Sequence, residues 1–263
     1  MLKIITADER MLKKEIKALI VGKYKVGKTT LVTTLPEDKT LFVDMEAGML
    51  SIQNWKGDSI GTTDEDKIRD WPTMKKISAW ISGPNKTLKP TEDYSQYYYD
   101  EVCKNFPDPK ALDKYEHIFI DSISVASRLC KKWCEDEVVR TGQEGNKFAV
   151  YGMLADEMLG WITQMQHTVG KSVWIIGLLN EKTDDLGRKT HVIQIEGSKA
   201  GLEIPGIVDQ IFTMANVDFE TGPAKALITN EGNSHGYRAG DRSGKLDPYE
   251  RPDLGAIAKK ILG

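Results

Sequence analysis

The chain has 263 residues, which could form one large α/β domain or, alternatively, two small ones, and its apolar content of 40% is enough for a real core. Its formal net charge of −3 argues against a surface that is basic overall and confines any nucleic-acid contact to local patches. No uninterrupted apolar stretch is long enough to span a bilayer, and Asp8, Glu9 and Arg10 break the N-terminal apolar run, so we expect no membrane partner, no signal peptide and a cytoplasmic protein.

The most specific motif lies near the start of the chain, at residues 22–29. These residues match G-x-x-x-x-G-K-S/T at every fixed position. The apolar residues 18–21 predict a buried strand before the motif, and residues 29–35 predict a helix after it, which is the context that the motif needs. Such a unit turns backbone N–H groups towards one point, at the positive end of a helix dipole. The sequence therefore predicts a binding site for a nucleoside triphosphate.

Two side chains of this loop have distinct expected roles. The Lys28 ammonium can reach the β- and γ-phosphates, and the Thr29 hydroxyl can hold Mg²⁺. ATP and Mg²⁺ are therefore the expected cofactors. The residues expected to hold the nucleotide here are Gly22, Lys23, Tyr24, Lys25, Val26, Gly27, Lys28, Thr29 and Thr30.

An acidic residue follows the second predicted strand, which covers residues 40–44. Glu46 lies just past the end of this strand, where a carboxylate could polarise a water molecule that attacks the γ-phosphate. The alternative is an ordinary solvated loop acid. Farther along, apolar residues recur at helical spacing over residues 71–81 and predict a helix.

Residues 83–110 differ in composition from the segments around them. They contain four prolines, many charged residues and Tyr94, Tyr97, Tyr98 and Tyr99. We expect an insertion over the core rather than a core element. The tyrosines could offer stacking faces for unpaired bases, but aromatic residues in such a lid more often pack the lid onto the core.

A third strand is predicted at residues 118–121, and it ends in Asp121. The end of a parallel strand places this carboxylate at the sheet edge beside the P-loop. This is the Walker B geometry, in which the acid holds Mg²⁺ through its water shell. Thr29 and Asp121 are therefore the expected metal-site residues.

The remaining elements continue the alternation of helices and strands. Helices are predicted from about 125 to 139 and around 154–165, with a polar loop at 141–147 between them. A buried strand at 172–179, strands near 208–214 and 225–229, and a helix at 253–262 follow. This order predicts an α/β fold with a mostly parallel sheet flanked by helices, in a single domain over residues 1–263.

The three cysteines suggest reduced thiols, because their number is odd and they show no framework spacing. Cys130 and Cys134 are four residues apart and could share a helix face. No second pair of Cys or His with zinc spacing accompanies them. We therefore expect core cysteines rather than a metal site.

Two segments carry a resemblance to a known family. The strand–Asp–x–Glu sequence at residues 42–46, followed by Ile120-Asp121-Ser122, resembles the ATPase core of RecA-like recombinases. The chain looks like the phage and prophage RecA-like nucleotide-binding proteins, which include ATP-dependent single-strand annealing proteins. The resemblance implies a RecA-like P-loop NTPase core with Glu46 as the catalytic base. The matching segments are residues 21–30, 41–48, 115–124, 173–182, 196–212 and 240–245.

The resemblance also implies a γ-phosphate sensor and DNA-contacting loops. A polar residue at the end of the strand at 172–179 would sense the γ-phosphate, and either Asn180 or Glu181 could do so; alternatively, both merely begin an exposed loop. The DNA loops would map to about 140–150 and 181–199. Acidic residues are interspersed there, and such charge runs are usually just solvated. The candidate DNA-binding residues are Lys147, Arg188, Lys189 and Lys199.

A third implication concerns assembly. Residues 241–244 resemble the Lys-x-Arg-x-Gly segment by which RecA-like hexameric ATPases place an arginine finger in a neighbour's active site, and Arg242 falls on the finger position. Gly240 replaces the lysine, so a second trans cation is missing unless Arg238 substitutes. The alternative is a surface arginine in a turn. The resemblance implies a homo-oligomer, either a ring or a filament.

The motif predicts a nucleotide-binding site, and the resemblance implies a DNA-stimulated ATPase. It would act in DNA recombination through ATP-regulated binding or annealing of single-stranded DNA, in a bacterial host cell and encoded by a phage or prophage. A single-strand DNA-binding protein is a further partner that the resemblance implies. The alternatives are a nucleic-acid motor or packaging ATPase and a nucleotide-dependent switch or assembly protein without DNA binding. A small-molecule phosphotransferase is disfavoured, because Glu46 beside Asp121 suits water activation better.

Overall fold

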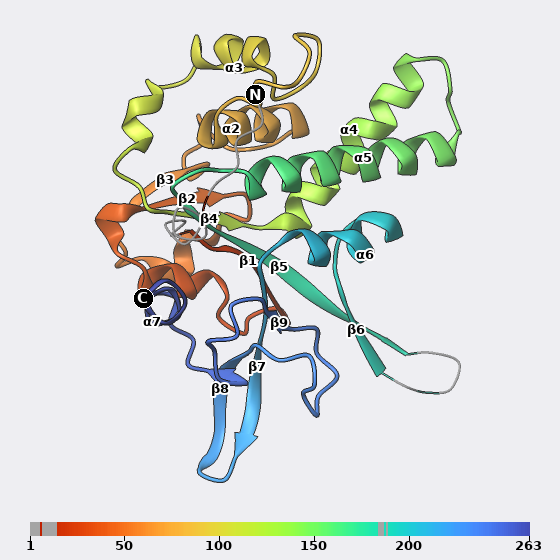
Figure 1. Cartoon of the computed structure of the whole chain (residues 1–263). Coiled ribbons are helices and arrows are strands. Elements are labelled where there is room, and N and C mark those ends of the chain that lie inside the picture. Colours follow the sequence, from red (N-terminus) through yellow and green to blue (C-terminus); the bar gives the residue numbers. More distant parts are fainter. Residues whose placement is uncertain (1–5, 7–14, 184–186, 188) are drawn as a thin grey trace.

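The computed structural model describes residues 6, 15–183, 187 and 189–263. In this part of the chain, ten strands form one sheet with the order β10-β8-β7-β1-β5-β4-β2-β3, while β6 pairs with β5 and β9 pairs with β7. β1 (Lys17–Gly22) lies at the centre and pairs in parallel with β5 (Ser172–Thr183) and β7 (Gln210–Phe219). The predicted α/β fold with a mostly parallel sheet is confirmed (Figure 1).

The strands beside β1 bring three loops to one edge of the sheet. β2 (Thr40–Asp44), β4 (His117–Asp121) and β3 (Asp58–Ile60) complete the parallel part. Every residue of β1, β2 and β4 is buried, because helices cover both faces of a parallel sheet and the strands are correspondingly apolar. Asp44 pairs with Asp121 across the two strand ends, at the same edge as the end of β1.

The rest of the sheet is antiparallel. β7 and β8 (Gly222–Ile228) form a long hairpin, to which β9 (Gly240–Asp241) and β10 (Tyr249–Glu250) add short strands. β5 continues to Thr183, past the end at residue 179 predicted from the sequence. The reason is that its last residues pair with β6 (Lys189–Ile193), a strand that was not predicted from the sequence.

Helices cover the two faces of the sheet (Figure 1). Residues of α2, α4, α5 and α6 share one apolar cluster with Leu19, Val21 and Ile120. Residues of η1, η3 and α7 share a second cluster with Ile20 and Phe42 on the other face. The helix bounds are α2 Trp71–Ser82, α4 Ile123–Arg140, α5 Lys147–Gln166, α6 Ser198–Ile207 and α7 Leu254–Leu262, with 3₁₀ helices η1 Thr29–Thr34, η2 Glu37–Lys39 and η3 Gly48–Ile52.

Polar residues fix where the helices begin. The side chains of Asp70, Ser122, Asn146 and Asp253 accept backbone N–H bonds at the starts of α2, α4, α5 and α7. The helix predicted after the P-loop is only the 3₁₀ helix η1. Its β-branched residues resist an α-helix, and the Thr33 and Thr34 hydroxyls bond back to carbonyls three residues earlier.

The segment at residues 83–110 contains α3 (Gln96–Cys103) and the start of η4 (Pro109–Leu112). Tyr94 is buried, and its ring meets that of Tyr98 edge to face at 6.1 Å, so these two tyrosines pack the segment onto the core. Lys75 of α2 adds an ion pair to Asp93 at 2.6 Å. The expected packing role is therefore confirmed for Tyr94 and Tyr98.

Two other predictions concern the core and the membrane. Cys130 and Cys134 are fully buried on α4, as expected for core cysteines. Among the helices of the described residues, none combines the length and the apolar character needed to cross a bilayer.

Candidate nucleotide-binding site

Three loops meet in a cavity at the carboxyl edge of the sheet. They follow β1, β2 and β4. Lys28 and Glu46 in the first two loops and Asp121 at the end of β4 line one cavity of about 530 Å³. The residues that line it are Tyr24, Lys25, Gly27, Lys28, Thr29, Thr30, Glu46, Ser51, Asp121, Leu178 and Lys225. The structure therefore places the predicted phosphate, metal and base residues together.

Lys28 is held inside this cavity by its own loop. Its side chain is buried, and Nζ donates to the carbonyl oxygens of Gly22 at 3.0 Å and Lys23 at 2.8 Å. Burial lowers the pKa of Lys28, whereas the carboxylates of Asp121 and Glu46 act in the opposite direction. The carbonyl oxygens of the loop therefore hold the ammonium group inside the cavity.

The two fixed glycines of the motif are needed for different reasons. Gly27 has φ +107°, a conformation that side chains disfavour. At Gly22, an added Cβ would lie 2.6 Å from the Met214 carbonyl oxygen on β7. The first reason is conformational and the second is the close approach of the neighbouring strand.

Thr29 and Asp121, the two residues expected to hold a metal, are in direct contact. The Thr29 hydroxyl donates to Asp121 Oδ2 at 2.5 Å, and Asp121 is 1% exposed. Burial raises the pKa of Asp121 to about 7; Glu46 and Asp44 add to this rise, while Thr29 and Lys28 oppose it. A hydroxyl and a carboxylate beside a phosphate site are the oxygen donors that Mg²⁺ prefers, so these residues fit the metal.

Glu46 is positioned by two other side chains. Asp44, which is buried, accepts the backbone N–H groups of Glu46 at 2.9 Å and Gly48 at 3.0 Å and so fixes the turn after β2. The Ser122 hydroxyl donates to Glu46 Oε1. Ser122 also caps α4, and sequence reasoning had used it only as part of the Ile-Asp-Ser match.

Neither of the two predicted sensor residues, Asn180 and Glu181, lines the cavity. Asn180 is exposed on β5, opposite Val192 of β6, and is not among the residues that line the cavity, to which β5 contributes Leu178. Glu181 Oε2 lies 3.9 Å from Lys23 Nζ of the P-loop and 3.8 Å from His191 Nε2. Asn180 is displaced from the cavity because the strand does not end there. Glu181 instead connects the β5–β6 hairpin with the P-loop.

The candidate DNA-binding residues do not form one patch in the described structure. Lys147 begins α5 at the tip of the α4–α5 hairpin, while Lys199 of α6 lies 3.9 Å from Asp156 Oδ1. Arg188 lies outside the described residues, and Lys189 is described only by its backbone position in β6. Beside Lys147, Phe148 is 94% exposed, which sequence reasoning did not single out.

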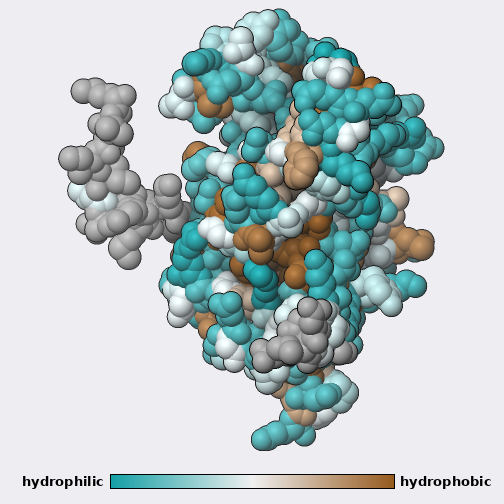
Figure 2. Space-filling view, turned by 90° about the vertical axis from the view of Figure 1, so that its right-hand side faces the viewer, coloured by the Kyte–Doolittle hydropathy of each residue, from teal (hydrophilic) through white to brown (hydrophobic). Residues whose placement is uncertain are grey.

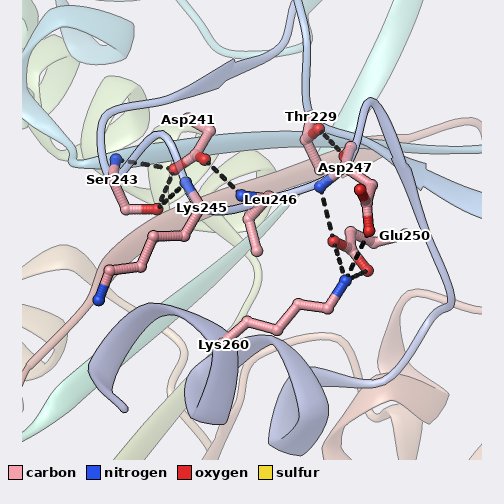
Figure 3. Close-up of polar contacts among 8 residues, drawn as sticks. All are labelled: Thr229, Asp241, Ser243, Lys245, Leu246, Asp247, Glu250 and Lys260. Atoms are coloured by element: carbon pink, nitrogen blue, oxygen red, sulfur yellow. Dashed lines mark hydrogen bonds and ion pairs between the residues drawn. The ribbon is translucent and has the colours of Figure 1, made fainter.

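Arg242 is not among the residues that line the cavity of its own chain. Its guanidinium is partly exposed and lies 3.0 Å from Asp209 Oδ1. Asp241 beside it accepts the backbone N–H groups of Ser243 at 2.8 Å and Leu246 at 3.0 Å. These bonds hold the turn that follows Asp241, and farther along Lys260 bridges Asp247 and Glu250 (Figure 3).

A second cleft, of about 310 Å³, lies between β6 and α6. Arg238 lines it together with the apolar residues Ile193, Ile195 and Leu202, of which Leu202 is 68% exposed. Figure 2 looks onto the side of the molecule that carries α6 and β6 and shows apolar side chains gathered in a hollow near its centre. Arg238 therefore faces this cleft and not the nucleotide cavity.

Lys225 is a cavity residue that sequence reasoning missed. It lies on β8 and reaches the cavity because the β7–β8 hairpin folds back beside the P-loop. No motif marks it, since its position depends on pairing within an antiparallel hairpin.

One comparison with known proteins, the match to a family model, shows the class of domain. The family model AAA_24, described as an AAA domain, matches residues 14–243. A search of curated proteins gave no significant match. Among solved structures, a KaiC-like protein from the hyperthermophilic archaeon Pyrococcus horikoshii OT3 is similar at 13% identity, with 81% of this chain and 77% of that chain covered and a TM-score of 0.34.

Proposed function

Because the chain belongs to the AAA domain family AAA_24, we propose that it binds ATP with Mg²⁺ and hydrolyses it in the cavity between the P-loop, Glu46 and Asp121. One observation carries this proposal. The phosphate-binding lysine, the Thr29–Asp121 pair and a carboxylate held by Ser122 all line one cavity. Hydrolysis needs these three kinds of group together.

Each residue has a defined task in this proposal. Lys28 turns its donors from the P-loop carbonyls to the β- and γ-phosphates, and the backbone N–H groups of the loop hold the same oxygens. Thr29 and Asp121 would hold the metal, which would neutralise phosphate charge. Ser122 fixes Glu46 by one carboxylate oxygen, so the other can take a proton from the attacking water.

Two substitutions test the binding and the chemistry separately. Lys28→Ala should abolish tight Mg·ATP binding, because it removes a buried cation from the phosphate cradle. Glu46→Gln should keep binding but lower kcat by about 100-fold or more, since an amide keeps the shape but cannot act as a base. Calorimetry with Mg·ATP and a phosphate-release assay measure the two effects.

Glu65→Gln is the matched control, because Glu65 is exposed and does not line the cavity. It should leave kcat unchanged. Unchanged turnover in Glu46→Gln would remove Glu46 as the base and leave a nucleotide-binding domain with another source of water activation.

We further propose that ATP controls binding of single-stranded DNA in recombination or annealing, and that the α4–α5 tip contacts the DNA. Exposed Phe148 beside Lys147 supports this, because an aromatic face next to a cation suits base stacking and phosphate contact. The tip extends away from the sheet and is accessible to a strand (Figure 1). The Glu181–Lys23 contact offers a link between the P-loop and the β5–β6 hairpin.

Fluorescence anisotropy with a labelled oligothymidylate, with and without Mg·ATP, tests this second proposal. Phe148→Ala should weaken binding by about 1–3 kcal/mol, the typical contribution of one stacked base. Lys147→Ala should lower the slope of log affinity against log salt by about 0.7, the value for one phosphate contact on a single strand.

Tyr97→Ala is the control, since Tyr97 is an exposed aromatic residue on α3, outside the proposed contact. It should not change binding. No DNA binding by the unmutated protein with Mg·ATP present would favour the nucleotide-dependent switch or assembly protein instead.

A further inference from the structure

A second ammonium group lies over the P-loop, on an element outside the motif. Lys225 of β8 faces the cavity that holds Lys28. An added Cβ on Gly27 would lie 3.4 Å from Lys225 Nζ and 3.5 Å from the Met214 methyl group. The ammonium therefore lies directly beside the glycine backbone of the phosphate loop.

The position of Lys225 is fixed by strand pairing. β7 pairs with β1 through Met214 and Gly22, at the point where the P-loop begins. Within the hairpin, Asn216 on β7 lies opposite Lys225 on β8. Two successive strand pairings thus carry Lys225 to the loop, so its placement belongs to the sheet and does not depend on a flexible segment.

The ammonium group of Lys225 has no partner among the described protein groups. In the described part of the chain, no ion pair or hydrogen bond engages its ammonium, and the residue is exposed. Lys25 and Lys28 of the motif also line the cavity, and Lys28 already faces Asp121 and Glu46, which oppose the burial effect on its pKa. An unpaired cation beside backbone N–H groups is suited to an anion.

We propose that Lys225 is a second phosphate-binding cation that acts within its own chain and contacts the phosphate chain of the nucleotide beside Gly27. This inference rests on the proposed nucleotide-binding function. A triphosphate carries more negative charge than the metal and Lys28 neutralise, so a second ammonium has a clear partner. The β7–β8 hairpin is then a wall of the nucleotide site.

Binding of Mg·ATP and of inorganic tripolyphosphate to the full chain tests the proposal, with isothermal titration calorimetry as the readout. Lys225→Met keeps most of the aliphatic stem but removes the charge, and it should weaken both ligands by about 10- to 100-fold, as expected for one charge-assisted hydrogen bond. Lys225→Arg should retain affinity within about threefold, since it keeps a cation at the same place.

Lys76→Met is the matched control, because Lys76 is exposed on α2, away from the cavity, and its loss changes the net charge equally. It should bind both ligands like the unmutated protein. Thermal unfolding without ligand should be the same for all variants, since Lys225 has no ion pair to lose; if Lys225→Met unfolds, Lys225→Gln takes its place.

The outcomes separate this inference from the function on which it rests. Normal affinity of Lys225→Met, with binding lost in Lys28→Ala, would overturn the role of Lys225 and leave nucleotide binding intact. Equal losses in Lys225→Met and Lys225→Arg would also overturn it, because charge would then not be what matters. No binding of Mg·ATP by the unmutated protein would overturn both.

Discussion

At the scale of single residues, three carboxylates crowd the carboxyl edge of the sheet. Asp44 and Asp121 pair across the ends of β2 and β4, and Glu46 follows two residues after Asp44. Burial raises the pKa of Asp44 as well as that of Asp121. The ionised forms of Asp44 and Asp121 are therefore less favourable here than in water, although Lys28 lies beside Asp121, and without a metal they destabilise the folded protein.

Asp121→Asn measures this effect. The pKa of Asp121 is about 7 in the folded protein, above the ordinary value of 3.8, so the folded state binds more protons and stability falls as pH rises from about 4 to about 7. Asp121→Asn cannot ionise at this position, so its stability should not fall with pH for this reason. In metal-free buffer its unfolding free energy should exceed that of the unmutated protein by about 1–3 kcal/mol at pH 8, and the difference should shrink towards zero near pH 4.

Urea unfolding with a chelator present, at several pH values, gives this difference. Added Mg²⁺ should reduce the difference in unfolding free energy at pH 8, because only the unmutated protein keeps the carboxylate that binds the metal. A difference that stayed constant with pH would show that Asp121 titrates normally in the fold.

Positions of site residues could be predicted only where a motif fixes them. Lys28, Thr29, Glu46 and Asp121 come together because each lies at or just past the end of a parallel strand, which a sequence pattern reveals. Asn180 does not line the cavity, since the pattern could not show that β5 continues into a hairpin. Lys225 could not be found, because an exposed lysine on a hairpin carries no local signal.

At the scale of elements, apolar runs between polar breakers predicted the bounds of two parallel strands to within one residue. The predicted strand at 40–44 coincides with β2, and 118–121 differs from β4 by one residue. The prediction at 71–81 likewise differs from α2 by one residue, since helical spacing and the Asp70 cap mark it.

Elements that depend on tertiary pairing were missed. α6 contains Pro205 and two glycines, which disfavour a helix locally, and it is stabilised by burial of Ala200 and Ile204 against the core. β3 and β6 are short or polar strands, and they are stabilised by pairing with β2 and β5. Local patterns contain no information on such partners.

At the scale of the whole molecule, Arg242 and the cleft between β6 and α6 bear on assembly. Asp209 holds Arg242 on the surface, and Arg242 does not line the cavity of its own chain. This is the position expected of a residue that completes the site of a neighbouring copy. We propose a homo-oligomer in which Arg242 completes the neighbour's site. The partly exposed apolar cleft with Leu202 is a surface that such a contact can bury.

Mixing two inactive variants tests the trans arrangement. Arg242→Ala should bind Mg·ATP but hydrolyse it at least about 1,000-fold more slowly, since an arginine finger acts mainly in the transition state. Mixed with Glu46→Gln, it should regain part of the activity, because some interfaces then carry both intact residues. Phosphate release at increasing total protein concentration measures this, and it should rise more steeply than linearly.

Arg251→Ala is the control, as Arg251 is an exposed arginine beside β10. It should be active alone. If Arg242→Ala and Glu46→Gln stay inactive in every mixture although subunits exchange, Arg242 acts within its own chain or has no catalytic role.

The first strand of the described sheet is also its central one. β1 becomes fixed only when β5, which begins at Ser172, and β7, which begins at Gln210, have joined it on either side. During synthesis the segment that carries the P-loop leaves the ribosome long before these partners, and closing such long loops is slow. The phosphate-binding loop is therefore made early and shaped late, and a nascent chain that has not reached β7 contains the motif but not the site.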